Sequence, residues 1–369
     1  MNVTDLLSRG WEALTRRIDT FLFVAAAAIV LVGLVTLYSA TDQSLVRVQT
    51  QAMSLAFALV LMWVVANIAP EKLARIAVPL YATAVALLVA VAVAGTVVNG
   101  SRRWLDVGVA RFQPSELMKI ALPLMLAWYF QRFEGRIGWR DFLLATVMIV
   151  VPVYLIKRQP DLGTAMLIAA SGFYVLFLAG LSWKVIVGLV GLAGVAAPML
   201  WPLLHDYQRE RVLTFLDPSR DPLGAGYHSM QASIALGSGG LVGKGWLNGT
   251  QAHLDFLPER HTDFIFAVFG EEFGLVGNVI LVVLYLLLIG RAMVITANAS
   301  TLFARLMAGT TTLMFFTYAF VNMAMVSGLM PVVGVPLPLV SYGGTALISL
   351  FLGLGILMSV QAHRKLVAG

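Results

Sequence analysis

The chain has 369 residues, of which 59% are hydrophobic and only 12% are charged, and its formal net charge is +6. A soluble globular domain carries about 25% charged residues. The composition, with a mean hydropathy of +0.86, therefore excludes a water-soluble protein. The absence of cysteine excludes disulfide bonds and thiol chemistry.

Apolar runs of about twenty residues recur along the chain, and a helix of that length crosses a bilayer. We predict an all-α, polytopic integral membrane protein with a single domain over residues 1–369. Residues 1–20 lack the apolar core of a signal peptide and are predicted to form an interfacial segment, with a frayed tail as the alternative. Residues 204–262 are predicted to form one long extracytoplasmic loop. The ten predicted spans lie at about 21–40, 52–69, 76–98, 114–131, 141–157, 162–181, 183–203, 263–290, 302–327 and 338–362.

Lysine and arginine counts in the loops predict the orientation. The loops on the side of the termini hold 13 basic residues and the opposite loops hold 12, but five of these 12 belong to the long segment 204–262. Without that segment the count is 13 against 7, which favours cytoplasmic termini. The outer basic residues indicate either an anionic ligand or ordinary snorkelling. Six of the seven are Arg102, Arg103, Arg111, Lys119, Lys157 and Arg158.

Carboxylates also gather at the predicted outer face. Taken singly, the acids of QPSE (113–116) and QPD (159–161) fit helix starts, where proline and an acid are common. Asp263 follows Thr262, a candidate N-cap, and opens the eighth span. Glu271 and Glu272 lie about 12 Å further along that helix and should face protein or a wet cavity. The six outer acids are Asp106, Glu116, Asp161, Asp255, Glu259 and Asp263.

Other common site motifs are absent from the sequence. The stretch GSGGLVGKG (237–245) fails the phosphate-loop pattern, because Ser238 stands at the first glycine position and Gly245 follows Lys244. We interpret it as flexible turns. The five histidines have no metal-ligand spacing, and no G-x-S-x-G is present. Hydrolase and nucleotide-binding functions therefore have no support.

Five long stretches carry a resemblance to a known family. They are NGSRRWLDVGVARFQPSELMKI (99–120), RQPDLGTAM (158–166), RVLTFLDPSRDPLGAGYHSMQASIALGSGGLVGKG (211–245), LPERHTDFIFAVFGEEFG (257–274) and PLPLVSYGGTALISL (336–350). Together they resemble the SEDS family, and within it the RodA branch that serves cell elongation. The FtsW branch typically has Ala where this chain has Arg260, and a different residue at Val340.

The resemblance implies a peptidoglycan glycosyltransferase that joins lipid II into a growing glycan strand in the cytoplasmic membrane. It also implies a class B penicillin-binding protein as partner and no nucleic acid. The family's essential aspartate corresponds to Asp263. Its other important outer residues correspond to Glu116, Lys119 and Asp161.

The residues agree with that chemistry. A β-1,4 link formed from an α-linked lipid diphosphate inverts the anomeric carbon, so one carboxylate must accept the proton of the acceptor hydroxyl. Cations can stabilise the departing diphosphate, so a second catalytic acid is not required. We expect Asp263 to be the base and substrate to be bound by Glu116, Lys119, Asp161, Arg102, Arg103 and Arg211. The sequence does not decide whether a divalent cation assists the diphosphate. The alternatives are a flippase for the same lipid, although no inverted repeat is visible, and a non-catalytic scaffold.

Overall fold

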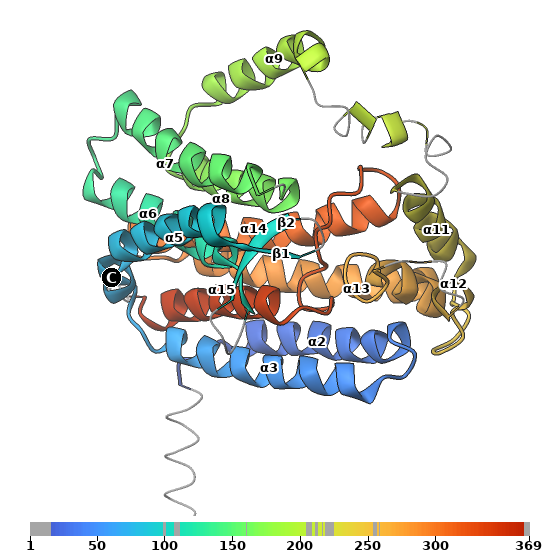
Figure 1. The fold of residues 1–369 in the computed structure, drawn as a ribbon. Coiled ribbons are helices and arrows are strands. Elements are labelled where there is room, and N and C mark those ends of the chain that lie inside the picture. The colour runs from blue at the N-terminus through green and yellow to red at the C-terminus, as the bar shows by residue number, and fades with distance from the viewer. Residues whose placement is uncertain are drawn as a thin grey trace, which may run out of the picture.

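The computed structural model describes residues 16–98, 101–106, 111–159, 161–203, 209–210, 213–215, 217, 225–253, 257 and 259–364. A helix lies in each of the ten predicted spans, and Figure 1 shows them arranged as one bundle. These helices are α2 (Thr20–Ala40), α3 (Leu45–Ala66), α5 (Ala77–Ala94), α6 (Pro114–Arg132), α7 (Trp139–Lys157), α8 (Leu162–Leu178), α9 (Trp183–Leu200), α13 (Ile265–Ala297), α14 (Leu302–Val326) and α15 (Gly344–Ala362). Shorter helices are α4 (Pro70–Arg75), the 3-10 helix η1 (Trp201–Leu203), α11 (Ala225–Ser238) and α12 (Thr250–His253).

Seven of the helices in the described part of the chain are long and apolar enough to cross a membrane: α2, α3, α5, α7, α13, α14 and α15. This confirms a polytopic, mainly helical membrane protein. The other three fall short of that criterion. Helix α8 has 17 residues, the apolar run of α9 is short, and α6 carries Glu116 and Lys119. Crossings by these three stay predictions, and most of the predicted interfacial segment lies outside the described residues.

Several boundaries differ from the sequence prediction, among them the end of α13 at Ala297 instead of near 290. Helix α3 begins at Leu45 rather than near 52, because apolarity marks only the lipid-facing part of a helix and Arg47 and Gln51 lie in its first turns. The third span ends at Ala94. The last helix begins at Gly344, and residues 338–343 before it are non-helical, with Leu339 at φ 66°.

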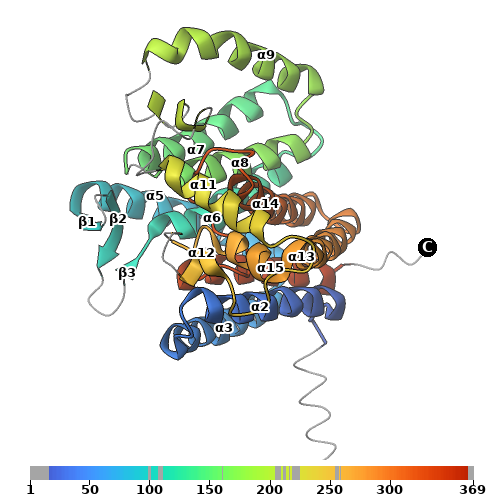
Figure 2. The same cartoon turned by 90° about the vertical axis from the view of Figure 1, so that its right-hand side faces the viewer.

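The loop after α5 holds a small antiparallel sheet that the sequence did not predict. Its strands, in the order β1-β2-β3, are β1 (Thr96–Val98), β2 (Ser101–Asp106) and β3 (Arg111–Phe112). Strands of three, six and two residues are too short to show an alternating pattern. The sheet places β2 against α6, as Figure 2 shows.

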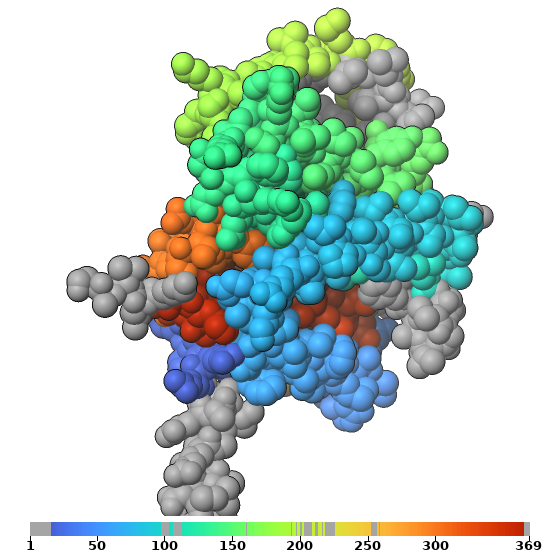
Figure 3. Space-filling model, turned by 90° about the vertical axis from the view of Figure 1, so that its left-hand side faces the viewer, coloured from blue at the N-terminus to red at the C-terminus, as the bar shows by residue number. Residues whose placement is uncertain are grey.

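Two apolar cores hold the bundle together. One joins α2, α13 and α15, and the other joins α5, α6 and α8 to the start of α14. Figure 3 shows the C-terminal α15 (red) beside the N-terminal helices (blue), in agreement with its packing on α3. Helix α14 packs on α6, α8, α13 and α15, so it runs through the middle of the bundle. Helix α9 lies at the edge in Figures 1 and 2.

The long segment 204–262 is more ordered than a simple loop where the structure describes it. It contains α11 and α12, and α11 packs on α13. The predicted flexible turns at 237–245 are wrong, because the backbone of Lys244 and Gly245 donates to carbonyls of α13. Glycine content alone does not distinguish a mobile turn from a close backbone contact.

The charge count predicts that both termini are cytoplasmic, and exposed loop positions allow a direct test. In this Cys-free chain a cysteine at Leu329, after α14, should react with a membrane-impermeant thiol reagent in intact cells. A cysteine at Glu134, after α6, should react only after permeabilisation. The side chains of Leu329 and Glu134 are both exposed, so burial within the protein does not account for a difference in labelling between the two positions. The reverse labelling pattern would contradict the orientation.

Candidate active site

Asp263 lies in a turn formed by residues 259–264, directly before α13. The sequence predicted that Asp263 opens this helix, but α13 begins two residues later, at Ile265, and Asp263 precedes it. Thr262 is not the N-cap: Phe264 is, and the Thr262 hydroxyl donates to the backbone and carboxylate of Glu259. Glu259 has φ 49°, a left-handed conformation that closes the turn.

Residues far away in the sequence hold this turn through its backbone carbonyls. The Tyr342 N–H donates to the carbonyl of His261 at 2.9 Å. The Ser341 hydroxyl donates to the carbonyl of Thr262 at 2.6 Å. The buried Asn322 amide donates to the carbonyl of Asp263 at 2.8 Å and to that of Val335 at 2.7 Å. Three successive carbonyls are thus fixed by α14 and by the segment before α15.

The Asp263 carboxylate itself receives no hydrogen bond from any residue that the structure describes. A Cβ added at Gly334 would lie 3.3 Å from Oδ2 of Asp263. The glycine therefore leaves space beside the carboxylate that the side chain of any other residue would occupy. Burial, together with the negative charge of Glu259, raises the pKa of Asp263 to about 6. Burial, with the positive charge of Arg47, lowers the pKa of His261. The turn therefore carries an unusually basic carboxylate beside an imidazole that favours its neutral form.

Lys119 and Glu116 form a nearly buried ion pair on α6. The Lys119 Nζ lies 2.7 Å from Glu116 Oε1, and the two side chains are 10% and 12% exposed. The Ser349 hydroxyl of α15 donates to Glu116 Oε2 at 2.9 Å. The Tyr318 ring of α14 lies under the ammonium at 5.4 Å. A cavity of about 510 Å³, including space open to the outside, begins at Lys119 and runs between α6, α14 and α15.

Asp161 has both a helix-start role and an ionic one. Its Oδ1 accepts from the Thr164 N–H at 3.1 Å and so caps α8, as the sequence predicted. Its Oδ2 lies 3.5 Å from Arg103 Nη1 of β2 and accepts from Gln113 at 3.4 Å. Arg102 lies next to Arg103 on β2, but its side chain is outside the described residues, as is the whole of Arg211.

Two features bring these groups to one end of the bundle. Tyr318, under Lys119, and Asn322, which holds the Asp263 carbonyl, are four residues apart on α14 and thus about 6 Å along one face. A Cβ added at Gly163, in the first turn of α8 after Asp161, would come within 2.5 Å of the Val333 carbonyl. Gly334, the next residue, faces Asp263. Asp263, Lys119 and Asp161 therefore lie at the same end of the bundle.

No group of three or more His, Cys, Asp or Glu side chains that could hold a metal ion occurs among residues whose positions are described. Protein-bound metal sites depend on such donor clusters. The question of a divalent cation, left open by the sequence, is not answered by this observation.

Comparisons with known proteins agree with this arrangement. The sequence model of the family described as "Cell cycle protein" and named for FtsW, RodA and SpoVE matches residues 17–366. The chain belongs to this family.

Its relatives in the FtsW/RodA/SpoVE family share both sequence and fold. The chain is 52% identical over 350 residues to "Peptidoglycan glycosyltransferase MrdB" of Escherichia coli K12, covering 95% of this chain and 94% of that one. It is 37% identical to the protein of the same name from Helicobacter pylori J99, over 95% and 93% of the two chains.

Two solved structures extend the comparison. One is described as "Structural coordination of polymerization and crosslinking by a peptidoglycan synthase complex"; it matches at 36% identity and a TM-score of 0.82, over 94% of this chain and 99% of that one. The other is the RodA protein of Thermus thermophilus, at 33% identity and a TM-score of 0.71, over 94% and 98%.

Sequence reasoning missed the residues that orient the site of this family member. Asn322, Ser341 and Ser349 act through hydrogen bonds to segments that are far away in the sequence. A signal was present for Asn322, since an amide inside an apolar span usually has a specific partner. Ser341 lies in the stretch PLPLVSYGG that carried the resemblance, but no role was assigned to it.

Proposed function

We propose that this protein is an inverting peptidoglycan glycosyltransferase that polymerises lipid II into β-1,4-linked glycan strands at the outer face of the cytoplasmic membrane during cell elongation. The observation that carries the proposal is the Asp263 carboxylate: the backbone of its turn is fixed at the carbonyls of residues 261–263, while the described residues give its oxygens no donor. The curated relatives named peptidoglycan glycosyltransferase support the same activity.

The proposed step uses one base. Asp263 accepts the proton of the acceptor's 4-hydroxyl, and that oxygen forms a bond to the anomeric carbon of the donor. The bond from the anomeric carbon to the diphosphate oxygen breaks, and the diphosphate leaves with the electron pair. Attack opposite to the leaving group converts the α link into a β link. A carboxylate with a pKa of about 6 is a stronger base than an ordinary aspartate and is still mostly ionised at pH 7.

Lys119 and Arg103 are the proposed binding groups for the diphosphate. Lys119 keeps donors beyond the one used by Glu116, and it lines the cavity between α6, α14 and α15. Arg103 is about one-third exposed and held near the site by Asp161. Arg102 and Arg211 are proposed to add to this positive charge. Glu116 and Asp161 orient the two cations rather than touch phosphate, because like charges repel.

A class B penicillin-binding protein is the proposed partner. The support is the 36% identical chain from a peptidoglycan synthase complex that couples polymerization and crosslinking. The match covers 99% of that chain, which supports a similar assembly for this protein.

Asp263→Asn should abolish polymerisation while leaving the fold intact. Asparagine keeps the size and the backbone contacts of Asp263 but loses the basic lone pair, so the rate should fall on the order of 100-fold or more. The measurement is the length distribution of products made from labelled lipid II by purified protein. Thermal stability and lipid II binding serve as controls and should match wild type. Polymerisation near the wild-type rate would remove Asp263 from the mechanism and favour the flippase or the scaffold.

The rate should depend on the ionisation of Asp263. Because a base must be deprotonated, kcat/KM should rise with pH around a midpoint near 6 and level off above pH 7. Glu259→Gln removes the negative charge that helps to raise this pKa, so its midpoint should move to lower pH. Glu134→Gln, in a loop on another part of the chain, is the matched control and should leave the midpoint unchanged. A midpoint insensitive to Glu259 would contradict the assignment.

Lys119→Met should weaken lipid II binding about tenfold or more, because a hydrogen bond between two charged groups in a partly dry site is lost. It should also lower stability by up to about 3 kcal/mol, because Glu116 is left without its cation. The double variant Lys119→Met with Glu116→Gln should recover stability but not binding. If binding follows stability in both variants, Lys119 serves only as the partner of Glu116.

A further inference from the structure

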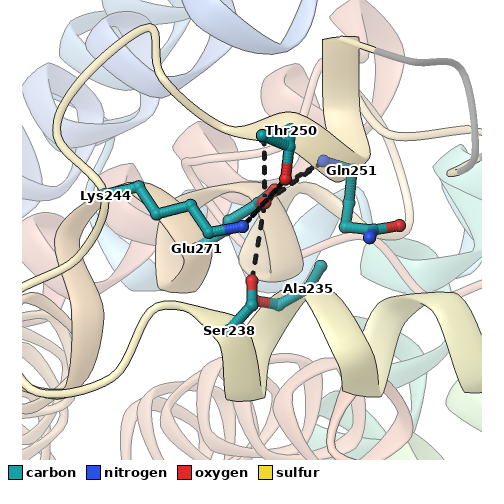
Figure 4. A network of polar contacts seen from close by, with 6 residues as sticks. All are labelled: Ala235, Ser238, Lys244, Thr250, Gln251 and Glu271. Carbon is teal, nitrogen blue, oxygen red and sulfur yellow. Dashed lines mark hydrogen bonds and ion pairs between the residues drawn. The ribbon is translucent and has the colours of Figure 1, made fainter.

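Two adjacent carboxylates in α13 have no part in the proposed reaction. Glu271 is 0% exposed and Glu272 is 1% exposed, so of the two predicted surroundings, protein or a wet cavity, both side chains have protein. Their partners differ. Glu271 faces the segment 244–251, whereas Glu272 accepts from Ser39 of α2. Figure 4 shows the groups that converge on Glu271.

Helix α13 is broken three residues after Glu271. Gly274 has φ 66° and ψ −164°, which no α-helix allows, so hydrogen bonds of the regular ladder are lost on both sides. In a membrane such free backbone groups are costly because no water can replace the lost partners. The break must therefore be compensated by another part of the protein.

The loop before α12 supplies that compensation. The N–H groups of Leu275 and Val276 donate to the carbonyls of Gly240 and Leu241 at 2.9 and 3.0 Å. In the other direction, the N–H groups of Lys244 and Gly245 donate to the carbonyls of Glu271 and Glu272, both at 3.0 Å.

The two backbones meet without intervening side chains. A Cβ at Gly243 or at Gly274 would overlap the opposite backbone.

The Glu271 carboxylate holds the far end of the same loop. It accepts from Lys244 Nζ at 2.6 Å, from the Thr250 N–H at 2.9 Å and from the Thr250 hydroxyl at 3.0 Å. The Gln251 N–H donates to both carboxylate oxygens, at 3.1 and 3.2 Å. One buried side chain thus ties both ends of the loop to the helix at the point where it breaks.

The break separates the part of α13 that follows Asp263 from the rest of the helix. Residues 265–273 form a short helical segment, and a continuous hydrogen-bond ladder does not extend through Gly274 to set its direction. We propose that Glu271 is a positioning residue for the glycosyl transfer: by clamping residues 244–251 onto the break, it fixes the half-helix that presents Asp263 to the substrate. This inference rests on the proposed role of Asp263 as the base.

The test compares Glu271→Gln with Glu272→Gln. Both remove one buried carboxylate charge from the same turn of the same helix, but the hydrogen bonds to Lys244, Thr250 and Gln251 are made by Glu271. Glu271→Gln should lower kcat by about tenfold to a hundredfold and leave KM for lipid II nearly unchanged, because misplacing a reacting group by about 1 Å has effects of that size. Glu272→Gln should keep kcat within about threefold of wild type.

A cross-link supplies the readout that a general loss of stability would not produce. Val276 N–H donates to the Leu241 carbonyl, and both side chains are exposed, so cysteines placed there can be bridged by oxidation or by a short bis-thiol reagent. In the Glu271→Gln background the bridge should restore kcat, and reduction of a disulfide bridge should remove the gain. The same pair in the wild-type background, with and without the bridge, is the control.

Three results would overturn the positioning role. They are a folded Glu271→Gln protein with wild-type kcat, equal losses in Glu271→Gln and Glu272→Gln, and a loss that the bridge does not restore. If Glu271→Gln does not fold, Lys244→Met replaces it, because Lys244 is partly exposed and its loss opens the same clamp. Asp263→Asn, assayed in parallel, separates the two hypotheses: an active Asp263→Asn protein contradicts the base, whatever Glu271 does.

Discussion

Backbone groups inside a bilayer must find protein partners, and three irregular segments among the described residues have such partners. The turn at 261–263 has its carbonyls taken by Tyr342, Ser341 and Asn322. The backbone groups on both sides of the break at Gly274 form hydrogen bonds with the loop 240–245. The non-helical segment before α15 is held at Pro338 by the hydroxyl of Tyr285. These irregular segments are stable only because distant segments supply hydrogen-bond partners for their backbone groups. The candidate site therefore depends on the whole bundle.

The carboxylates at this end of the molecule divide by their partners. Glu116, Asp161 and Glu271 each face a cation, at 2.7, 3.5 and 2.6 Å. An ion pair keeps both charges and the orientation of the carboxylate in place. Asp263 differs because the described residues offer its oxygens neither a cation nor a donor. This pairing agrees with orienting roles for the first three residues and with the proposed role of Asp263 in proton transfer.

The sequence predicted the parts of this structure that depend on local composition. Apolar length located ten helices, and the proline-acid pattern identified the capping role of Asp161. Contacts between distant segments could not be predicted. The glycines at 237–245 look like mobile turns, yet they pack against a helix break that is visible only when α13 is folded. Asn322 and Lys244 likewise have partners 59 and 27 residues away, and no local pattern encodes those pairs.

A general base, the proposed role of Asp263, has to be both basic and ionised, and its pKa affects these two requirements in opposite directions. Raising the pKa increases basicity, but it also lowers the fraction that is ionised at neutral pH. At a pKa of about 6 roughly nine-tenths of the carboxylate is still ionised at pH 7. An ion pair with a nearby cation would keep the Asp263 carboxylate ionised and make it a weaker base, and complete burial without partners would keep it protonated. The environment of Asp263, in the half-buried turn before α13, is intermediate between these two cases. The position of the carboxylate depends on the hydrogen bonds to the backbone of residues 261–263, which hold it in place without neutralising its charge.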